Sequence, residues 1–120
     1  MNLPANTVTI HPYFKAHAGK AEAFRESLPA FIERTTGEPL NLYYDFTSNG
    51  DEFFCREGYL GAEGTLAHLD NVGALLTELL KISDLTKLEI HGPADELAKL
   101  KEPLSALNPA WFTLECRVER

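Results

Sequence analysis

The hydrophobic residues of this chain repeat with two different periods, and the order in which these periods alternate limits the folds open to it. Period-two alternation, typical of half-buried strands, marks residues 7–14, 40–46, 53–59, 85–92 and 111–118. Helical spacing marks residues 19–36, 62–81 and 93–104. The order is β-α-β-β-α-β, followed by a short helix and a fifth strand. It predicts an α+β fold with a ferredoxin-like antiparallel sheet and a C-terminal helix and strand.

Single residues indicate where these elements bend or end. Pro12 cannot donate to a strand ladder, which favours an edge strand or a bulge at this point. Pro29 lies inside the first helical pattern and predicts a kink or one loosened turn, and Gly37 is a stop signal for that helix. Asn49-Gly50 predicts a hairpin between the second and third strands, because both residues tolerate positive φ.

Composition narrows the class of protein. A length of 120 residues with 44% hydrophobic content predicts one domain, residues 1–120, with a packed core. The net charge of -7 disfavours nucleic acid and anionic membrane surfaces, which both attract clustered Lys and Arg. No segment resembles a membrane span or a signal peptide, and two cysteines are too few for a disulfide framework. We therefore expect a cytoplasmic protein.

Aromatic residues are expected on both faces of the predicted sheet. A ferredoxin-like unit places its two helices on one face and leaves the other uncovered. Adjacent aromatics on a strand face opposite sides, as in the pairs Tyr43–Tyr44, Phe53–Phe54 and Trp111–Phe112. Of these, Tyr43, Phe54 and Trp111 are predicted to lie on the uncovered face. Large exposed apolar patches are uncommon on monomers, which predicts a homodimer with facing sheets. Scattered surface aromatics are the simpler alternative.

One histidine, His68, interrupts a helix that is otherwise rich in leucine. At about 100° per residue it borders the apolar stripe, close in angle to Leu75 and Leu79. Glu57 and Tyr59 share one face of the preceding strand and can lie near it. A histidine beside a carboxylate and a phenol can transfer protons at neutral pH. A core histidine that is bonded to a strand carbonyl is the alternative.

The segment EGYLGAEGTLAHL, residues 57–69, resembles the signature of the antibiotic biosynthesis monooxygenase (ABM) domain. That signature has a Glu, an aromatic residue two positions later, and a His-Leu pair nine positions after the aromatic. Here these residues are Glu57, Tyr59 and His68-Leu69. The order and spacing of the three parts together carry the resemblance.

The resemblance extends over most of the chain. Residues 19–45 are similar to the first helix and following strand of the family, and the similarity as a whole covers about residues 7–92. We expect this range to be an ABM-like core, with 93–120 as an extension that forms a helix and a strand. One departure is Tyr59, because the family often has Trp there. Gly61 also stands where a capping Ser or Asp is common.

The resemblance implies a dimeric α/β barrel built from two ferredoxin-like subunits, each with a pocket between sheet and helices. Many members are cofactor-free, quinol-monooxygenase-like enzymes that oxygenate small aromatic molecules with O2. By this resemblance His68 would be the catalytic proton acceptor, Tyr59 and Tyr44 would line the substrate pocket, and Glu57 would orient a partner. No organic or haem cofactor is expected.

Other functions stay open from the sequence. Haem-degrading enzymes of the same superfamily place a helical histidine on iron, although the second helix lacks the aromatic and amide residues expected there. A non-enzymatic dimeric module that binds a small apolar ligand is a further possibility. Cys55 and Cys116 are predicted to be small core residues. No metal site is expected, because no ligand spacing relates the four histidines, His11, His17, His68 and His91.

Overall fold

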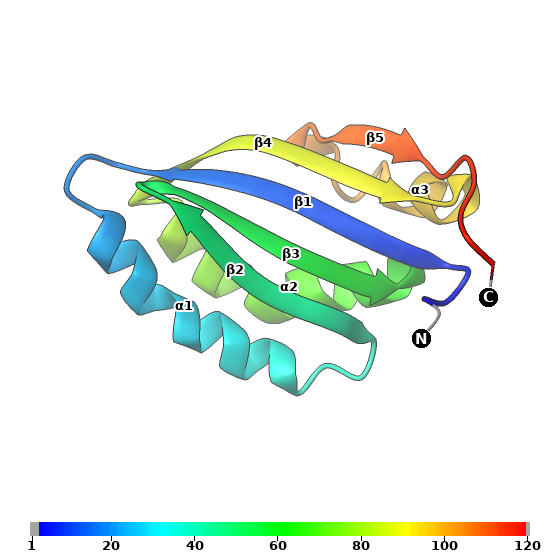
Figure 1. The fold of residues 1–120 in the computed structure, drawn as a ribbon, viewed down its shortest axis with the longest axis horizontal. Helices are drawn as coiled ribbons and strands as arrows, with labels where there is room; N and C mark the ends of the chain where they lie inside the picture. The colour runs from blue at the N-terminus through cyan, green and yellow to red at the C-terminus, as the bar shows by residue number, and fades with distance from the viewer. Residues whose placement is uncertain (1–2, 120) are drawn as a thin grey trace.

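The computed structural model describes residues 3–119 and has a five-stranded sheet with α1 and α2 on one face (Figure 1). The elements in chain order are β1 (Thr7–Ala16), α1 (Ala21–Thr36), β2 (Asn41–Asn49), β3 (Glu52–Leu60), α2 (Gly61–Leu79), β4 (Ser83–Gly92), α3 (Ala94–Leu100), the 3₁₀ turn η1 (Ser105–Leu107) and β5 (Ala110–Thr113). The predicted α+β, ferredoxin-like order is confirmed. Within residues 3–119, no helix is long and apolar enough to cross a lipid bilayer.

The strand order in the sheet is β2-β3-β1-β4-β5. The first four strands pair antiparallel, as predicted, but β5 pairs parallel to β4, so the sheet is mixed. The antiparallel core is confirmed, and the C-terminal strand, whose direction the sequence left open, joins it in parallel orientation. The reason is the connection through α3 and η1, because a helical crossover returns the chain in the direction of the preceding strand.

The central strand β1 contains Pro12. Because β1 lies between β3 and β4, the predicted edge position is wrong, and the predicted bulge is found instead as a register shift between Tyr13 and Phe14 on the β4 side. The first helix runs past Pro29 without interruption and ends at Thr36, with Gly37 as its C-cap. The hairpin between β2 and β3 turns at Gly50, with φ of 64°.

The last strand is shorter than predicted. The alternating pattern over 111–118 predicts a strand throughout, whereas β5 covers only Ala110–Thr113. The ladder ends because β4, its partner, ends at Gly92, whose carbonyl accepts a last bond from the Leu114 amide at 2.8 Å. The residues that follow are exposed. Cys116 is among them, so its predicted core position was wrong, whereas Cys55 is buried as predicted.

Trp111 lies on the helix-covered face of the sheet, contrary to prediction. It pairs with Ile90, whose side chain belongs to the core, and Lys101 lies 6.0 Å above its ring. The neighbouring Phe112 takes the uncovered face, where its ring stacks on His91. The alternation of a strand predicts that Trp111 and Phe112 face opposite sides of the sheet. The position of α3 decides which of these two residues is covered.

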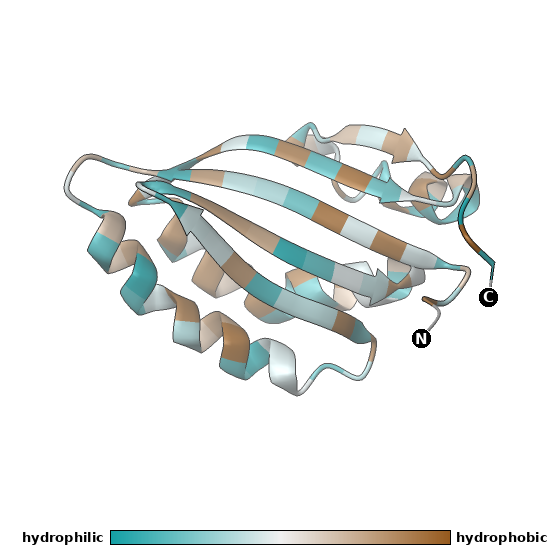
Figure 2. Ribbon diagram, viewed as in Figure 1, coloured by the Kyte–Doolittle hydropathy of each residue, from teal (hydrophilic) through white to brown (hydrophobic). Residues whose placement is uncertain are grey.

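Two apolar clusters fill the space between the sheet and the helices. One contains Val8, Tyr59 and Ile90 together with leucines of α3, and the other contains Phe14, Phe24 and Phe53. Figure 2 shows the alternation that produces them, with hydrophobic and hydrophilic bands following one another along β4. The sheet face opposite α1 and α2, named here the open face, carries Tyr13, Phe54 and Phe112 among its aromatics.

Candidate active site

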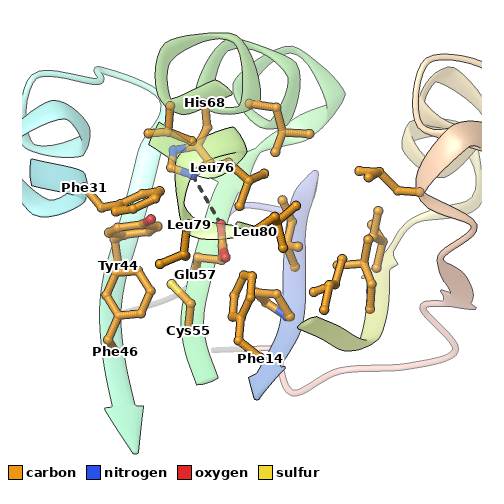
Figure 3. Close-up of a pocket in the computed structure, with 18 of the residues that line it drawn as sticks. Phe14, Phe31, Tyr44, Phe46, Cys55, Glu57, His68, Leu76, Leu79 and Leu80 are labelled. Atoms are coloured by element: carbon orange, nitrogen blue, oxygen red, sulfur yellow. Dashed lines mark ion pairs between the residues drawn. The ribbon is translucent and has the colours of Figure 1, made fainter. Parts of the chain in front are cut away.

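A narrow cavity lies between α2 and the helix-facing side of the sheet (Figure 3). Its free volume is about 60 Å³ and most of its lining is aliphatic or aromatic. Among the described residues that line it, those with polar side-chain atoms are Tyr44, Cys55, Glu57 and His68. Two leucines of the C-terminal extension, Leu104 and Leu107, also line the cavity. The space is therefore apolar, with one chemically active end.

Glu57 is a carboxyl group buried among apolar side chains. It lies on β3, whose period-two pattern turns Phe53, Cys55, Glu57 and Tyr59 toward the helices, and it is only 6% exposed. The Tyr59 hydroxyl donates a hydrogen bond of 2.6 Å to Oε1 of Glu57. Burial raises the pKa of the Glu57 carboxyl to about 7, although the hydrogen bond from Tyr59 lowers it. At neutral pH this group can therefore either give or take a proton.

His68 is the second member of the site and is 2% exposed. Its Nδ1 lies 2.9 Å from Oε2 of Glu38, and its Nε2 lies 3.5 Å from Oε1 of Glu57, with the two side chains pointing toward each other in Figure 3. Burial lowers the pKa of the imidazole, and the hydrogen bond with Glu38 opposes this shift. Because Nδ1–H donates to Glu38, Nε2 carries the lone pair that faces Glu57.

Glu38 was not found from the sequence. It lies in the loop between α1 and β2, 30 residues before His68, and its Oε2 also accepts a hydrogen bond of 2.8 Å from Asn71. A carboxylate just after a helix end was its only signal. Glu38 also borders a second hollow, of about 190 Å³, that it shares with Asn41 and Tyr44. Glu57, His68 and Glu38 thus form a row of groups from the apolar cavity to this polar hollow.

The two predicted tyrosines have different positions. The Tyr44 ring lies 5.0 Å from the His68 ring and lines the cavity. The Tyr59 ring lies 4.8 Å from His68, but this side chain is fully buried behind Glu57 and holds its carboxyl group. Burial raises the pKa of both phenols, and the negative charge of Glu57 adds to the effect, so both stay neutral.

Cys55 lies at the same end of the cavity. Burial raises the pKa of its thiol far above the ordinary value, and the charge of Glu57 raises it further. A thiol in this position stays protonated at neutral pH, and the protonated form is a poor nucleophile. The environment therefore fits the predicted packing role of Cys55.

The start of α2 is held by α3. Gly61 adopts φ of 63°, and the Ala62 amide behind it donates a hydrogen bond of 2.8 Å to Oε1 of Glu96. A Cβ atom on residue 61 would lie 2.7 Å from that same oxygen, so glycine leaves the space that Glu96 occupies. The missing N-terminal cap of α2 is thus supplied by the extension, which helps to fix the helix that carries His68.

Comparison with solved structures places the fold in one class. A protein from Nitrosomonas europaea, provisionally described as an antibiotic biosynthesis monooxygenase, has a TM-score of 0.66 at 19% identity over 78% of this chain and 96% of its own. A second antibiotic biosynthesis monooxygenase has a TM-score of 0.61 at 14% identity over 69% of this chain and 92% of its own. At these identities the similarity shows the fold alone, and that fold is the ABM fold.

A nearer relative is also found among the solved structures. The crystal structure of MupZ from Pseudomonas fluorescens has a TM-score of 0.93 and 38% identity, over 100% of this chain and 94% of MupZ. This chain is therefore a relative of MupZ, and it shares the fold of antibiotic biosynthesis monooxygenase proteins, as the resemblance of its sequence indicated. No protein-family model matches the sequence, and no curated protein matches it.

Proposed function

We propose that this protein is a cofactor-independent monooxygenase of a small, mostly apolar aromatic molecule of the phenol or quinol type. The observation that carries the proposal is the row Glu57–His68–Glu38 at the polar end of an otherwise apolar cavity. General acid–base catalysis needs such groups within hydrogen-bond reach of the substrate, with pKa values near the working pH. The ABM fold and the resemblance of residues 57–69 to the ABM signature support oxygenation as the reaction.

The proposed reaction begins with proton transfer. His68 Nε2 accepts the hydroxyl proton of the substrate, and the Glu38 carboxylate at Nδ1 stabilises the resulting imidazolium. The phenolate then donates electrons to O2, one oxygen forms a bond to a ring carbon, and the O–O bond breaks. The second oxygen leaves as water with the hydrogen from that ring carbon and a proton returned by His68 or Glu57. A phenol and O2 thus give a quinone and water.

The size of the cavity sets a condition on binding. An apolar cavity of roughly 150 Å³ accommodates benzene, whereas the present cavity measures about 60 Å³. A substrate ring therefore enters only when lining side chains move. Leu107, in the extension, is 38% exposed and also lines the cavity, so it stands between the interior and the surface. We assign the entrance to this end.

Oxygen uptake tests the proposed reaction. Chelator-treated protein, without added flavin or haem, should consume O2 and release a quinone when it is given hydroquinones, naphthols or anthrones, and turnover should stop under nitrogen. An oxygen electrode and absorbance of the quinone measure both events. If a substrate is converted equally well without O2, the site performs non-oxidative acid–base chemistry. Binding of these compounds without any turnover would instead favour the ligand-binding module.

We also propose that two copies associate through their open faces into a homodimer. The motive is the aromatic surface there: Tyr13 and Phe54 rings lie 4.6 Å apart, and Phe112 and Tyr43 are 44% and 36% exposed. Such a patch is uncommon on a monomer. A dimer would complete the barrel that the family resemblance implies.

Light scattering at micromolar concentration should give twice 13.4 kDa. Phe112→Glu should shift the mass toward that of a monomer, because a charge cannot be buried unpaired between two sheets. Ile32→Glu, which alters a similarly exposed apolar residue on α1, is the matched control and should leave the dimer intact. A monomer mass for the unaltered protein contradicts the proposal.

A further inference from the structure

Three side chains with metal-binding atoms meet on the open face, away from the cavity. His11 on β1 stands directly opposite Glu89 on β4, and His91 lies two residues after Glu89 on the same face of that strand. Each residue contributes one ligand atom, and these atoms all lie within 4.8 Å of one another. In Figure 1, β1 and β4 run side by side, and α1 and α2 lie against the other face of the sheet.

We propose that His11, Glu89 and His91 bind one divalent transition-metal ion of the Zn²⁺ type. Two imidazoles and a carboxylate are ligands that suit Zn²⁺ and its neighbours in the first row. Tetrahedral Zn²⁺ with bonds of about 2.0–2.2 Å brings its ligand atoms to about 3.4 Å from each other. Small side-chain rotations therefore convert the observed cluster into a three-residue site with a fourth position for another ligand.

The surroundings of the cluster favour neutral, oriented imidazoles, the form in which histidine binds a metal ion. The centroids of the His11 and His91 rings lie only 4.3 Å apart, so positive charges on the two rings would repel each other. Thr9 Oγ1 lies 2.8 Å from His11 Nε2 and can orient that ring.

Charges around Glu89 act in opposite directions. Its Oε2 pairs with Lys87 Nζ at 3.0 Å, a cation that competes with a metal ion for this carboxylate. Its other oxygen, Oε1, lies 3.2 Å from His91 Nε2, on the side that faces the two histidines. Lys87 is largely exposed and can swing into solvent, so it does not close the site.

A bound ion would join two strands, and one of its ligands packs against a third. It would link β1 to β4 directly, and the His91 ring stacks on Phe112 of β5 at 4.5 Å. Because all three ligands come from one chain, the site does not depend on the proposed reaction or on the proposed dimer. In a dimer, a group of the second copy could supply the fourth ligand.

Metal titration tests the site. Chelator-treated protein should bind one Zn²⁺ per chain by calorimetry, and Co²⁺ at the same site should give the visible absorption of a four-coordinate ion. His11→Ala and His91→Ala should each weaken binding at least about tenfold. His17→Ala is the matched control, because His17 also lies beside a carboxylate, Asp84 at 3.1 Å, but within residues 3–119 it belongs to no group of three potential ligands.

Circular dichroism shows whether each variant is folded, and Glu89→Gln, which keeps the shape of the side chain, serves if an alanine variant unfolds. This variant should also weaken binding. Absence of saturable Zn²⁺ binding to the folded, unaltered protein overturns the proposal. So does binding that survives in both His11→Ala and His91→Ala, or that is lost in His17→Ala, since the ion would then lie elsewhere.

Discussion

Replacing His68 with alanine should slow turnover of an accepted substrate about 100- to 10,000-fold, the usual contribution of a general acid–base group. The effect follows from position: Nε2 lies 3.5 Å from Glu57 at the end of the cavity, and Nδ1 is held by Glu38. Loss of the imidazole interrupts the path between the two carboxyl groups. The decrease should appear mainly in kcat, measured by steady-state kinetics, because most of the cavity lining is unchanged.

His17→Ala is the control for this experiment. His17 also bonds to a carboxylate, that of Asp84 at 3.1 Å, but its side chain is 43% exposed and does not line the cavity, so turnover should be unaffected. The result that contradicts the prediction is unchanged kcat together with a lower melting temperature. His68 would then be a core histidine whose hydrogen bond with Glu38 serves stability alone.

Replacing Phe24 with alanine should lower the free energy of unfolding by about 3–5 kcal/mol, as large-to-small changes of buried aromatics do. Phe24 is 0% exposed. Its ring centroid lies 4.0 Å from that of Phe53, on which it stacks, and 5.7 Å from that of Phe14. Removing the Phe24 ring leaves a void, and the Phe14 and Phe53 rings cannot move far enough to fill it. Since small domains have about 5–15 kcal/mol in total, much of the stability should be lost.

Urea unfolding followed by circular dichroism measures this loss. Ile32→Ala is the matched control on the same helix, because Ile32 is 41% exposed and its replacement should change stability by about 0.5 kcal/mol or less. A loss below about 1 kcal/mol for Phe24→Ala would mean that the neighbouring rings close the void, which is contrary to the close packing of protein interiors.

The sequence by itself determined the order of the helices and strands and the orientation of the residues along them. Period-two alternation on β3 turned Glu57 and Tyr59 toward the helices, and helical spacing put His68 on the covered side of α2. These are local properties, since the backbone geometry of one element decides which of its residues share a face. For that reason Glu57, Tyr59 and His68 could be expected to lie on facing sides of the sheet and helix before any contact was known.

Only the tertiary structure decided which distant groups join them. Glu38 comes from a loop, where no periodicity gives a direction to its side chain, and Glu96 caps α2 from another helix. His11 and Glu89 become neighbours only through the register of β1 with β4. Such pairings depend on how whole elements pack against one another. They cannot be predicted from the spacing of residues along the chain.

The same reason accounts for the errors near the C-terminus. Alternation correctly separated Trp111 from Phe112, but the position of α3 decided that Trp111 is the covered one. Alternation also continued to Val118, yet a strand needs a partner, and β4 ends at Gly92. Local pattern determines which residues can face a neighbour, and the tertiary structure decides whether that neighbour is present.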